Sequence, residues 1–155
     1  MKEIDIFEPK YLIFFCYDND SVEFLYNFLQ ELGYDFNKPI SNIVKKEVLN
    51  IIKELMKLDV IYVFHWGKDN IQMRNKTLSI QETLNYINKS WYENTKYPDY
   101  YDMVMFGYKK WYIEKLKDVG YIPNKTNWSE FVKENIGDLE KWIEENKPED
   151  ARKDE

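Results

Sequence analysis

The fold is decided by residues 41–64, which read SNIVKKEVLNIIKELMKLDVIYVF. Apolar residues recur at helical spacing through the first part of this stretch, at Val44, Val48, Ile51, Ile52, Leu55 and Leu58. Because such a stripe is typical of a helix with one face in the core, it predicts a helix from Ser41 to about Leu58. Asp59 ends that helix, and the β-branched and aromatic residues 60–64 predict a strand.

On the N-terminal side, residues 11–17 (YLIFFCY) form a short, continuously apolar segment. It predicts a buried strand, although a short buried helix would give the same pattern. Asp20 is predicted to cap a helix whose third residue is Glu23. That helix is expected to end at Gly33, where a left-handed backbone costs little in the absence of a Cβ.

On the C-terminal side, residues 67–70 predict a turn and residues 71–78 the return strand of a hairpin. Ser79 and Glu82 form a capping box that predicts a third helix. Residues 103–106 predict a further short strand, and two more helical patterns follow. The first of these helices ends at Gly120, and the second begins after Asn127 and is bent or split at Gly137.

This order of elements predicts an α+β fold. Its centre is expected to be winged-helix-like, with helices beside a small antiparallel sheet, and to be followed by additional C-terminal helices. Residues 1–146 are expected to form a single globular domain, and the charged residues 147–155 a disordered tail.

Composition excludes several classes of protein. The chain has 155 residues, a net charge of −6, one cysteine and one histidine. Too few thiols and imidazoles are present for a disulfide framework or a zinc site, so no metal and no cofactor is expected. An acidic chain is a poor binder of nucleic acid or anionic lipid, and no apolar run is long enough to cross a bilayer. We therefore expect a cytoplasmic protein that binds neither nucleic acid nor membrane.

The candidate catalytic residues are few. His65 ends the predicted strand among aromatic neighbours, and Cys16 lies between Phe15 and Tyr17. Both are interpreted as structural, because a backbone group can satisfy a lone histidine and burial raises the pKa of a thiol. The sequence thus predicts that the protein is not an enzyme. A small enzyme that uses His65 is the least favoured of three functional hypotheses, after the regulator and the binding protein described below.

The predicted long helix also carries several lysines, namely Lys45, Lys46, Lys53 and Lys57, and Lys68 and Arg74 lie in the following segment. In a winged-helix protein such a helix could contact DNA, which makes a transcriptional regulator the alternative reading. Glu47 and Glu54 share the helix, however, and side chains suited to base edges are scarce. The lysines are therefore interpreted as a solvated face.

A tyrosine-rich segment between the third and fourth helices is the candidate partner-binding site. Its aromatic and acidic members are Tyr92, Glu93, Tyr97, Asp99, Tyr100, Tyr101 and Asp102. Rigid rings beside carboxylates are suited to anchoring on a basic protein partner, with the carboxylates accelerating the encounter. The alternative is that these tyrosines pack against the third and fourth helices.

Three segments of the chain resemble small acidic immunity proteins of polymorphic and contact-dependent growth inhibition toxin systems. They are residues 55–63 (LMKLDVIYV), 78–91 (LSIQETLNYINKSW) and 101–106 (YDMVMF), within the middle half of the chain. The resemblance implies a winged-helix-like, non-enzymatic bacterial protein. It also implies that the protein binds and neutralises a cognate secreted toxin domain, for which a nuclease is one candidate. We expect the protein to be a monomer or weak dimer.

Overall fold

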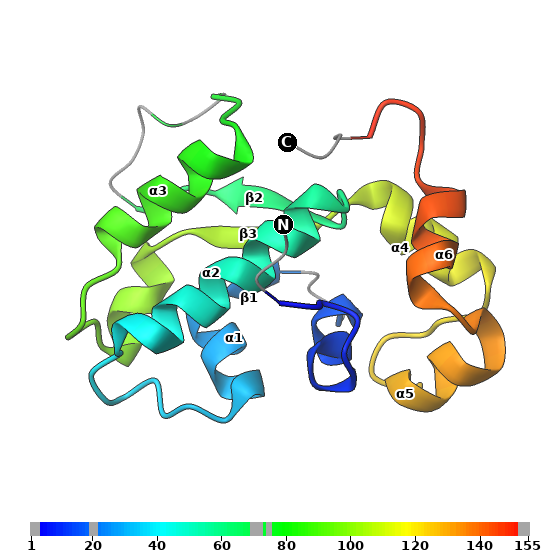
Figure 1. Ribbon diagram of the computed structural model, residues 1–155, viewed down its shortest axis with the longest axis horizontal. Coiled ribbons are helices and arrows are strands. Elements are labelled where there is room, and N and C mark those ends of the chain that lie inside the picture. Colours follow the sequence, from blue (N-terminus) through cyan, green and yellow to red (C-terminus); the bar gives the residue numbers. More distant parts are fainter. Residues whose placement is uncertain (1–3, 19–21, 69–72, 74–75, 152–155) are drawn as a thin grey trace.

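The computed structural model describes residues 4–18, 22–68, 73 and 76–151 (Figure 1). The α-helices are α1 (Leu25–Leu32), α2 (Asn42–Lys57), α3 (Ile80–Ser90), α4 (Lys110–Asp118), α5 (Trp128–Phe131) and α6 (Leu139–Asn146). The described residues also form the 3-10 helices η1 (Pro9–Phe15) and η3 (Tyr97–Asp102) and the π-helix η4 (Val132–Ile136). The three strands are β1 (Val22–Phe24), β2 (Ile61–His65) and β3 (Met105–Tyr108). The fold class is α+β, which confirms the prediction.

The sheet has the order β1-β3-β2, and β3 is antiparallel to both neighbours. Val22 pairs with Gly107, and Ile61 pairs with Tyr108. In Figure 1, α2 crosses in front of the sheet beside α3, and α4, α5 and α6 gather at the other end. One continuous core contains buried side chains from Ile6 to Ile143.

Helix α2 confirms the prediction made from its stripe. The Ser41 hydroxyl caps it by accepting a hydrogen bond from the Val44 N–H at 3.3 Å. Its inward face is completely buried at Val48, Ile51, Ile52 and Leu55. The helix ends where Asp59 adopts a left-handed backbone with φ 60°.

Asp59 also has a role that the sequence did not reveal. Its carboxylate is buried, lies 3.5 Å from the ammonium of Lys109, and accepts a hydrogen bond from the Trp111 indole at 3.2 Å. The same indole N–H donates to the Asp59 carbonyl at 2.8 Å. The end of α2 is therefore fixed to the start of α4, because a buried carboxylate is stable only when it is paired.

The strand predicted at residues 11–17 is wrong, and the alternative of a short buried helix is closer, because residues 9–15 form the 3-10 helix η1. Its carbonyls accept hydrogen bonds from side chains far along the chain instead of from a neighbouring strand. Tyr108 donates to the Phe14 carbonyl at 2.9 Å, Trp128 to the Leu12 carbonyl at 2.8 Å, and the Tyr112 hydroxyl to the Phe15 carbonyl. These donors satisfy the buried backbone that a strand would have paired in a ladder.

The predicted start of the helix that ends at Gly33 is also wrong, since Glu23 lies in β1 and α1 begins at Leu25. The proposed cap Asp20 lies outside the described residues. The predicted end is confirmed: Gly33 has φ 85°, and the Tyr34 N–H donates to the Leu29 carbonyl at 2.9 Å.

The winged-helix-like centre is not confirmed. The predicted return strand, residues 71–78, lies partly outside the described residues, and its described members Met73 and 76–78 are not in a strand. The partner of β2 is β3, which the chain reaches only after α3 and η3. The winged-helix prediction was based on a hairpin formed directly after the long helix. No such hairpin pairs with β2 in the described residues, because the partner of β2 is β3.

The helices after the sheet follow the predictions more closely. Ser79 and Glu82 form the capping box of α3, and the strand predicted at 103–106 lies two residues later, at 105–108. Gly120 ends α4 with φ 97°, and Gly137 with φ 82° separates η4 from α6. The predicted tail is described as far as Ala151, whose side chain is buried. No helix in the described ranges is long and apolar enough to cross a membrane.

Candidate partner-binding surface

Most of the predicted partner-binding residues lie on η3, where they differ widely in exposure. The side chains of Tyr92 and Tyr101 are 66% and 46% exposed, and Tyr97 is half-buried. Tyr100 is 0% exposed, and the Trp91 indole donates a hydrogen bond to its hydroxyl at 3.2 Å. The prediction that Tyr100 faces a partner is therefore wrong, because the 3-10 turn directs its ring into the core.

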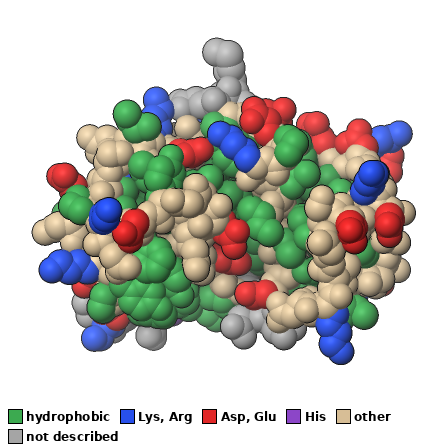
Figure 2. All heavy atoms as spheres, turned by 90° about the horizontal axis from the view of Figure 1, so that it is seen from below, with side chains coloured by type: hydrophobic (Ala, Val, Ile, Leu, Met, Phe, Trp, Pro, Cys, Tyr) green, Lys and Arg blue, Asp and Glu red, His purple; other side chains and the backbone are tan. Residues whose placement is uncertain are grey.

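The structure brings Tyr97 and Tyr101 together with three residues that come much earlier in the chain, from β1, α1 and the segment after α1. Phe24, Tyr26 and Phe36 complete this group, which we call the aromatic face. Ring centroids lie 5.0 Å apart for Phe24 and Tyr101, 5.1 Å for Tyr26 and Tyr97, and 5.2 Å for Phe36 and Tyr97. Figure 2 shows hydrophobic side chains gathered in a large area on the side of the molecule that carries α1 and η3. Tyr101 is exposed, and the other four residues are half-buried.

The hydroxyls of the aromatic face bond to one another. Those of Tyr97 and Tyr101 share a short hydrogen bond, and Tyr26 and Tyr101 lie 3.4 Å apart at their hydroxyls. The bond to Tyr101 raises the pKa of Tyr97. These contacts fix the rings relative to one another, so that a partner would meet a rigid surface with both apolar and polar parts.

The acidic members of the predicted site serve different purposes. The Asp99 carboxylate accepts the Lys96 N–H at 2.9 Å and so stabilises the first turn of η3. Asp102 is exposed at the end of η3. Glu93 is also exposed, but it lines a small cavity with Lys45 and Ile40, and its backbone carbonyl accepts the Ile40 N–H at 2.9 Å. Of these three acidic residues, Asp102 is thus the exposed carboxylate without a capping role that lies beside the aromatic face.

Phe24, Tyr26 and Phe36 were missed as site residues. From the sequence, only the tyrosine-rich segment between the third and fourth helices was considered as a partner-binding site. In the structure the buried stripe of α1 is Leu25, Phe28 and Leu29, so Tyr26 lies beside it. A helix that begins at Leu25 would have shown this, but the register depends on β1, which is set by pairing with a distant strand.

His65 and Cys16 have local structural partners. The His65 ring accepts the Gly67 N–H at 3.0 Å, which matches its interpretation as a histidine satisfied by a nearby backbone group. The Cys16 sulfur lies 3.1 Å from the Tyr121 hydroxyl, and burial raises the pKa of the thiol. Within the described residues, no cluster of three or more His, Cys, Asp or Glu could hold a metal ion.

Cys16 also lines a cavity of about 180 Å³ between η1 and α1, together with Glu23, Asp18 and Glu31. Burial raises the pKa of the Glu23 carboxyl to about 8, and the charges of Asp18 and Glu31 add to the effect. Glu23 therefore holds a proton at neutral pH, which makes it a pH-sensitive position in the sheet.

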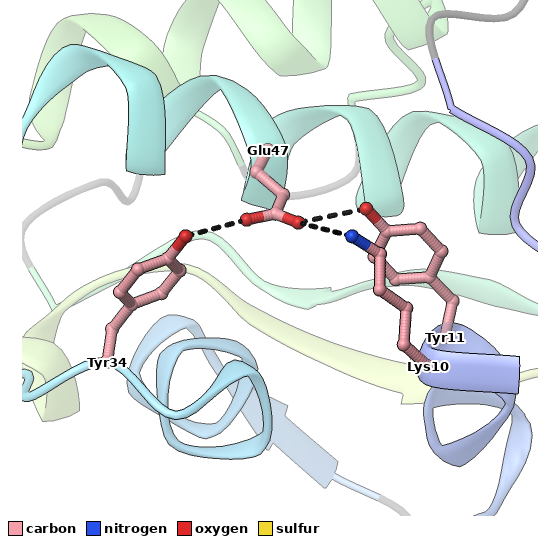
Figure 3. Close-up of polar contacts among 4 residues, drawn as sticks. All are labelled: Lys10, Tyr11, Tyr34 and Glu47. Atoms are coloured by element: carbon pink, nitrogen blue, oxygen red, sulfur yellow. Dashed lines mark hydrogen bonds and ion pairs between the residues drawn. The ribbon is translucent and has the colours of Figure 1, made fainter. Parts of the chain in front are cut away.

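A second polar cluster connects η1 to α2 (Figure 3). The Glu47 carboxylate accepts hydrogen bonds from the hydroxyls of Tyr11 at 2.8 Å and of Tyr34 at 3.0 Å. The Lys10 ammonium lies 3.8 Å from the same carboxylate and 4.8 Å from the Tyr11 ring centroid. Glu47, which the sequence placed on a solvated face, thus joins three segments of the chain.

Replacing Glu47 by Gln is expected to lower the free energy of unfolding by about 1–2 kcal/mol, because an amide oxygen cannot accept both hydroxyls as a carboxylate does. The midpoint of urea unfolding measures the change. Glu114→Gln is the matched control, since Glu114 pairs only with Lys110 at 3.7 Å on the surface of α4. An equal effect of the two substitutions would contradict a structural role for the Glu47 cluster.

Comparisons with protein-family models, with curated proteins and with solved structures each found no match.

Proposed function

We propose that the protein is a non-enzymatic binding protein, a cytoplasmic immunity protein that binds and neutralises a cognate toxin domain. The observation that supports this most directly is the aromatic face. Tyr26, Tyr97 and Tyr101 are packed against one another, yet their rings stay accessible to solvent. Tyrosine is enriched at protein interfaces, where its ring is buried and its hydroxyl finds a partner.

The edge of the aromatic face favours a basic partner. Asp102 is exposed beside it, and the chain as a whole carries a charge of −6. Toxin domains that act on nucleic acid need a positive surface, so an acidic binding protein could cover such a surface. In the proposed complex each copy of this chain binds one toxin domain, and the free protein is a monomer or weak dimer.

The test is binding to the C-terminal domain of the toxin encoded beside this protein, measured by co-purification and then by surface plasmon resonance. We expect a stable complex and loss of toxicity when the two proteins are co-expressed. Toxicity that persists despite a folded, co-expressed protein would reject the proposal.

Tyr101→Ala is expected to weaken this complex by about 2 kcal/mol or more, because an anchoring ring at the centre of an interface carries much of the binding energy. Tyr92→Ala is the matched control, since Tyr92 is more exposed but shares no ring contact with the aromatic face among the described residues. The dissociation rate should change for Tyr101 and not for Tyr92. A faster dissociation for Tyr92→Ala than for Tyr101→Ala would place the interface around Tyr92 and Glu93 instead.

The charge at the edge is tested separately with Asp102→Lys. This substitution should slow association, with an effect that shrinks as salt rises, because exposed charges act on the encounter through a screened field. Asp99 is unsuitable for this test, since its carboxylate caps η3.

A further inference from the structure

A second surface of the protein is the groove between α2 and α3, which lie side by side in Figure 1. It has a volume of about 510 Å³. Lys45, Lys46 and Lys53 line it from α2, and no Asp or Glu is among its lining residues. On a chain with a net charge of −6, a groove with three lysines and no carboxylate is locally positive.

We propose that this groove binds an extended, acidic peptide segment of a partner protein. The site is distinct from the aromatic face, and the proposal does not rest on the function suggested above. Three features of the groove support it: the spacing of its lysines, the amides on its walls and the absence of aromatic side chains from its lining.

The lysines are spaced for carboxylates on an extended chain. Lys45 and Lys53 are eight residues apart on one helix, which places them about 12 Å apart along the axis. In an extended peptide, side chains four residues apart lie on the same face at about 13 Å. Two acidic residues at that separation could therefore each meet one of these lysines.

The two lysines differ in their present partners. The Lys45 ammonium donates to the carbonyls of Trp91 at 2.6 Å and Asn88 at 3.3 Å, at the end of α3. These two hydrogen bonds fix the position of its charge beside the groove. Lys53 is half-buried and takes part in no ion pair within the described part of the chain. Its charge is thus uncompensated by a neighbouring carboxylate.

Side-chain amides line both walls of the groove beside the lysines. Asn42 and Asn50 lie on the α2 wall, and Gln81, Asn85 and Asn88 on the α3 wall. Each amide offers both a donor and an acceptor, the same pair of groups that a peptide backbone presents. Gln81 and Asn85 already bond to each other at 2.9 Å, which orders this row along α3. An extended backbone could pair with these amides while its carboxylates reach the lysines.

The lining residues argue against other ligands. Single-stranded nucleic acid is held by aromatic side chains on which bases stack, and none lines this groove. An amphipathic helix needs an apolar floor, whereas only Leu49 and Leu84 contribute apolar side chains. A polar, positive groove with paired amides fits an acidic extended segment better than either.

The test uses a short fluorescein-labelled peptide with Glu at every second position and Ser between, followed by fluorescence anisotropy. The same peptide with Gln in place of Glu tests the charge, and labelled oligothymidylate tests nucleic acid. We expect the Glu peptide to bind at least about tenfold more tightly than the Gln peptide, and its affinity to fall as salt rises. Equal binding of the two peptides, or tighter binding of oligothymidylate, would overturn the proposal.

Lys53→Glu should weaken binding of the Glu peptide by about tenfold or more, because it replaces attraction by repulsion. Lys89→Glu is the matched control, since Lys89 is exposed on α3 outside the groove and undergoes the same change of charge. Lys53→Gln, which removes the charge without reversing it, should show an intermediate loss. Circular dichroism confirms that each variant is folded.

Two results would reject the assignment of the groove. One is equal affinity of the Lys53→Glu and Lys89→Glu variants for the Glu peptide. The other is loss of peptide binding in Tyr101→Ala, which would move the peptide site to the aromatic face and leave the groove without a ligand.

Discussion

Ile52→Asp is expected to unfold the protein. Ile52 is 0% exposed in the middle of α2, where it lies on the same buried face as Val48 and Leu55. A carboxylate there would be buried without a partner and would also leave the space of the isoleucine side chain unfilled. The expected cost is more than about 4 kcal/mol, which is a large share of the stability of a domain of this size.

Ile43→Asp is the control for this experiment, because Ile43 lies in the first turn of the same helix and is 81% exposed. It introduces the same side chain near the positive end of the helix dipole, so its stability should be unchanged or slightly higher. Thermal melting followed by circular dichroism compares the two variants. A cooperative melt of Ile52→Asp at the temperature of the parent protein would show that this face of α2 is not the core.

Glu23 is expected to make stability depend on pH in the direction opposite to that of most carboxylates. Burial raises its pKa from 4.5 to about 8 in the folded protein. Between these two values the folded state holds one proton more than the unfolded state does, so stability falls as pH rises through this window. The contribution is complete below pH 4.5 and lost above about pH 8. We expect it to amount to about 3 kcal/mol, allowing for water at the mouth of the cavity.

Glu23→Gln keeps the shape of the side chain and removes its titration. The variant should therefore gain stability relative to the parent as pH rises, with the difference largest above pH 8. Urea unfolding midpoints at acidic, neutral and alkaline pH measure this difference. Glu134→Gln, at an exposed position of η4, should track the parent at every pH. A constant difference between parent and Glu23→Gln across the window would contradict a protonated Glu23.

Local signals predicted the parts of the fold that are stabilised locally. The stripe of α2, the Ser79–Glu82 capping box and the glycine at position 33 each act within a few residues, and each lies where the sequence indicated. The same holds for Gly137, where a left-handed backbone separates η4 from α6.

Long-range contacts decided the parts that the sequence did not predict. Nothing near Leu12 or Phe14 shows that Trp128 and Tyr108 satisfy their carbonyls, so a buried apolar run was read as a strand. The prediction that residues 71–78 pair with β2 failed for a similar reason, because strand pairing is decided by contacts between distant segments. The true partner, β3, comes only after α3 and η3.

The candidate sites divide in the same way. The tyrosines of η3 were recognised from composition, but which of them faces solvent depends on the 3-10 turn that buries Tyr100. The lysines of α2 were also recognised and were interpreted as a solvated face. The sequence did not show that amide side chains of α3 lie opposite them. Neighbours across a groove are set by helix packing, which a single sequence does not contain.

The position of β3 at the centre of the sheet has a consequence for how the chain is made. The ribosome releases β1 and β2 early, yet neither can find its neighbour until Met105–Tyr108 has been translated. Helix α2 can form before β3 is made, but its apolar face stays exposed to solvent until the sheet has assembled. Nascent chains that stop before Met105 should therefore be bound by chaperones and cleaved by proteases. Chains a few residues longer than Tyr108 should be the first in which the three strands become protected from hydrogen exchange.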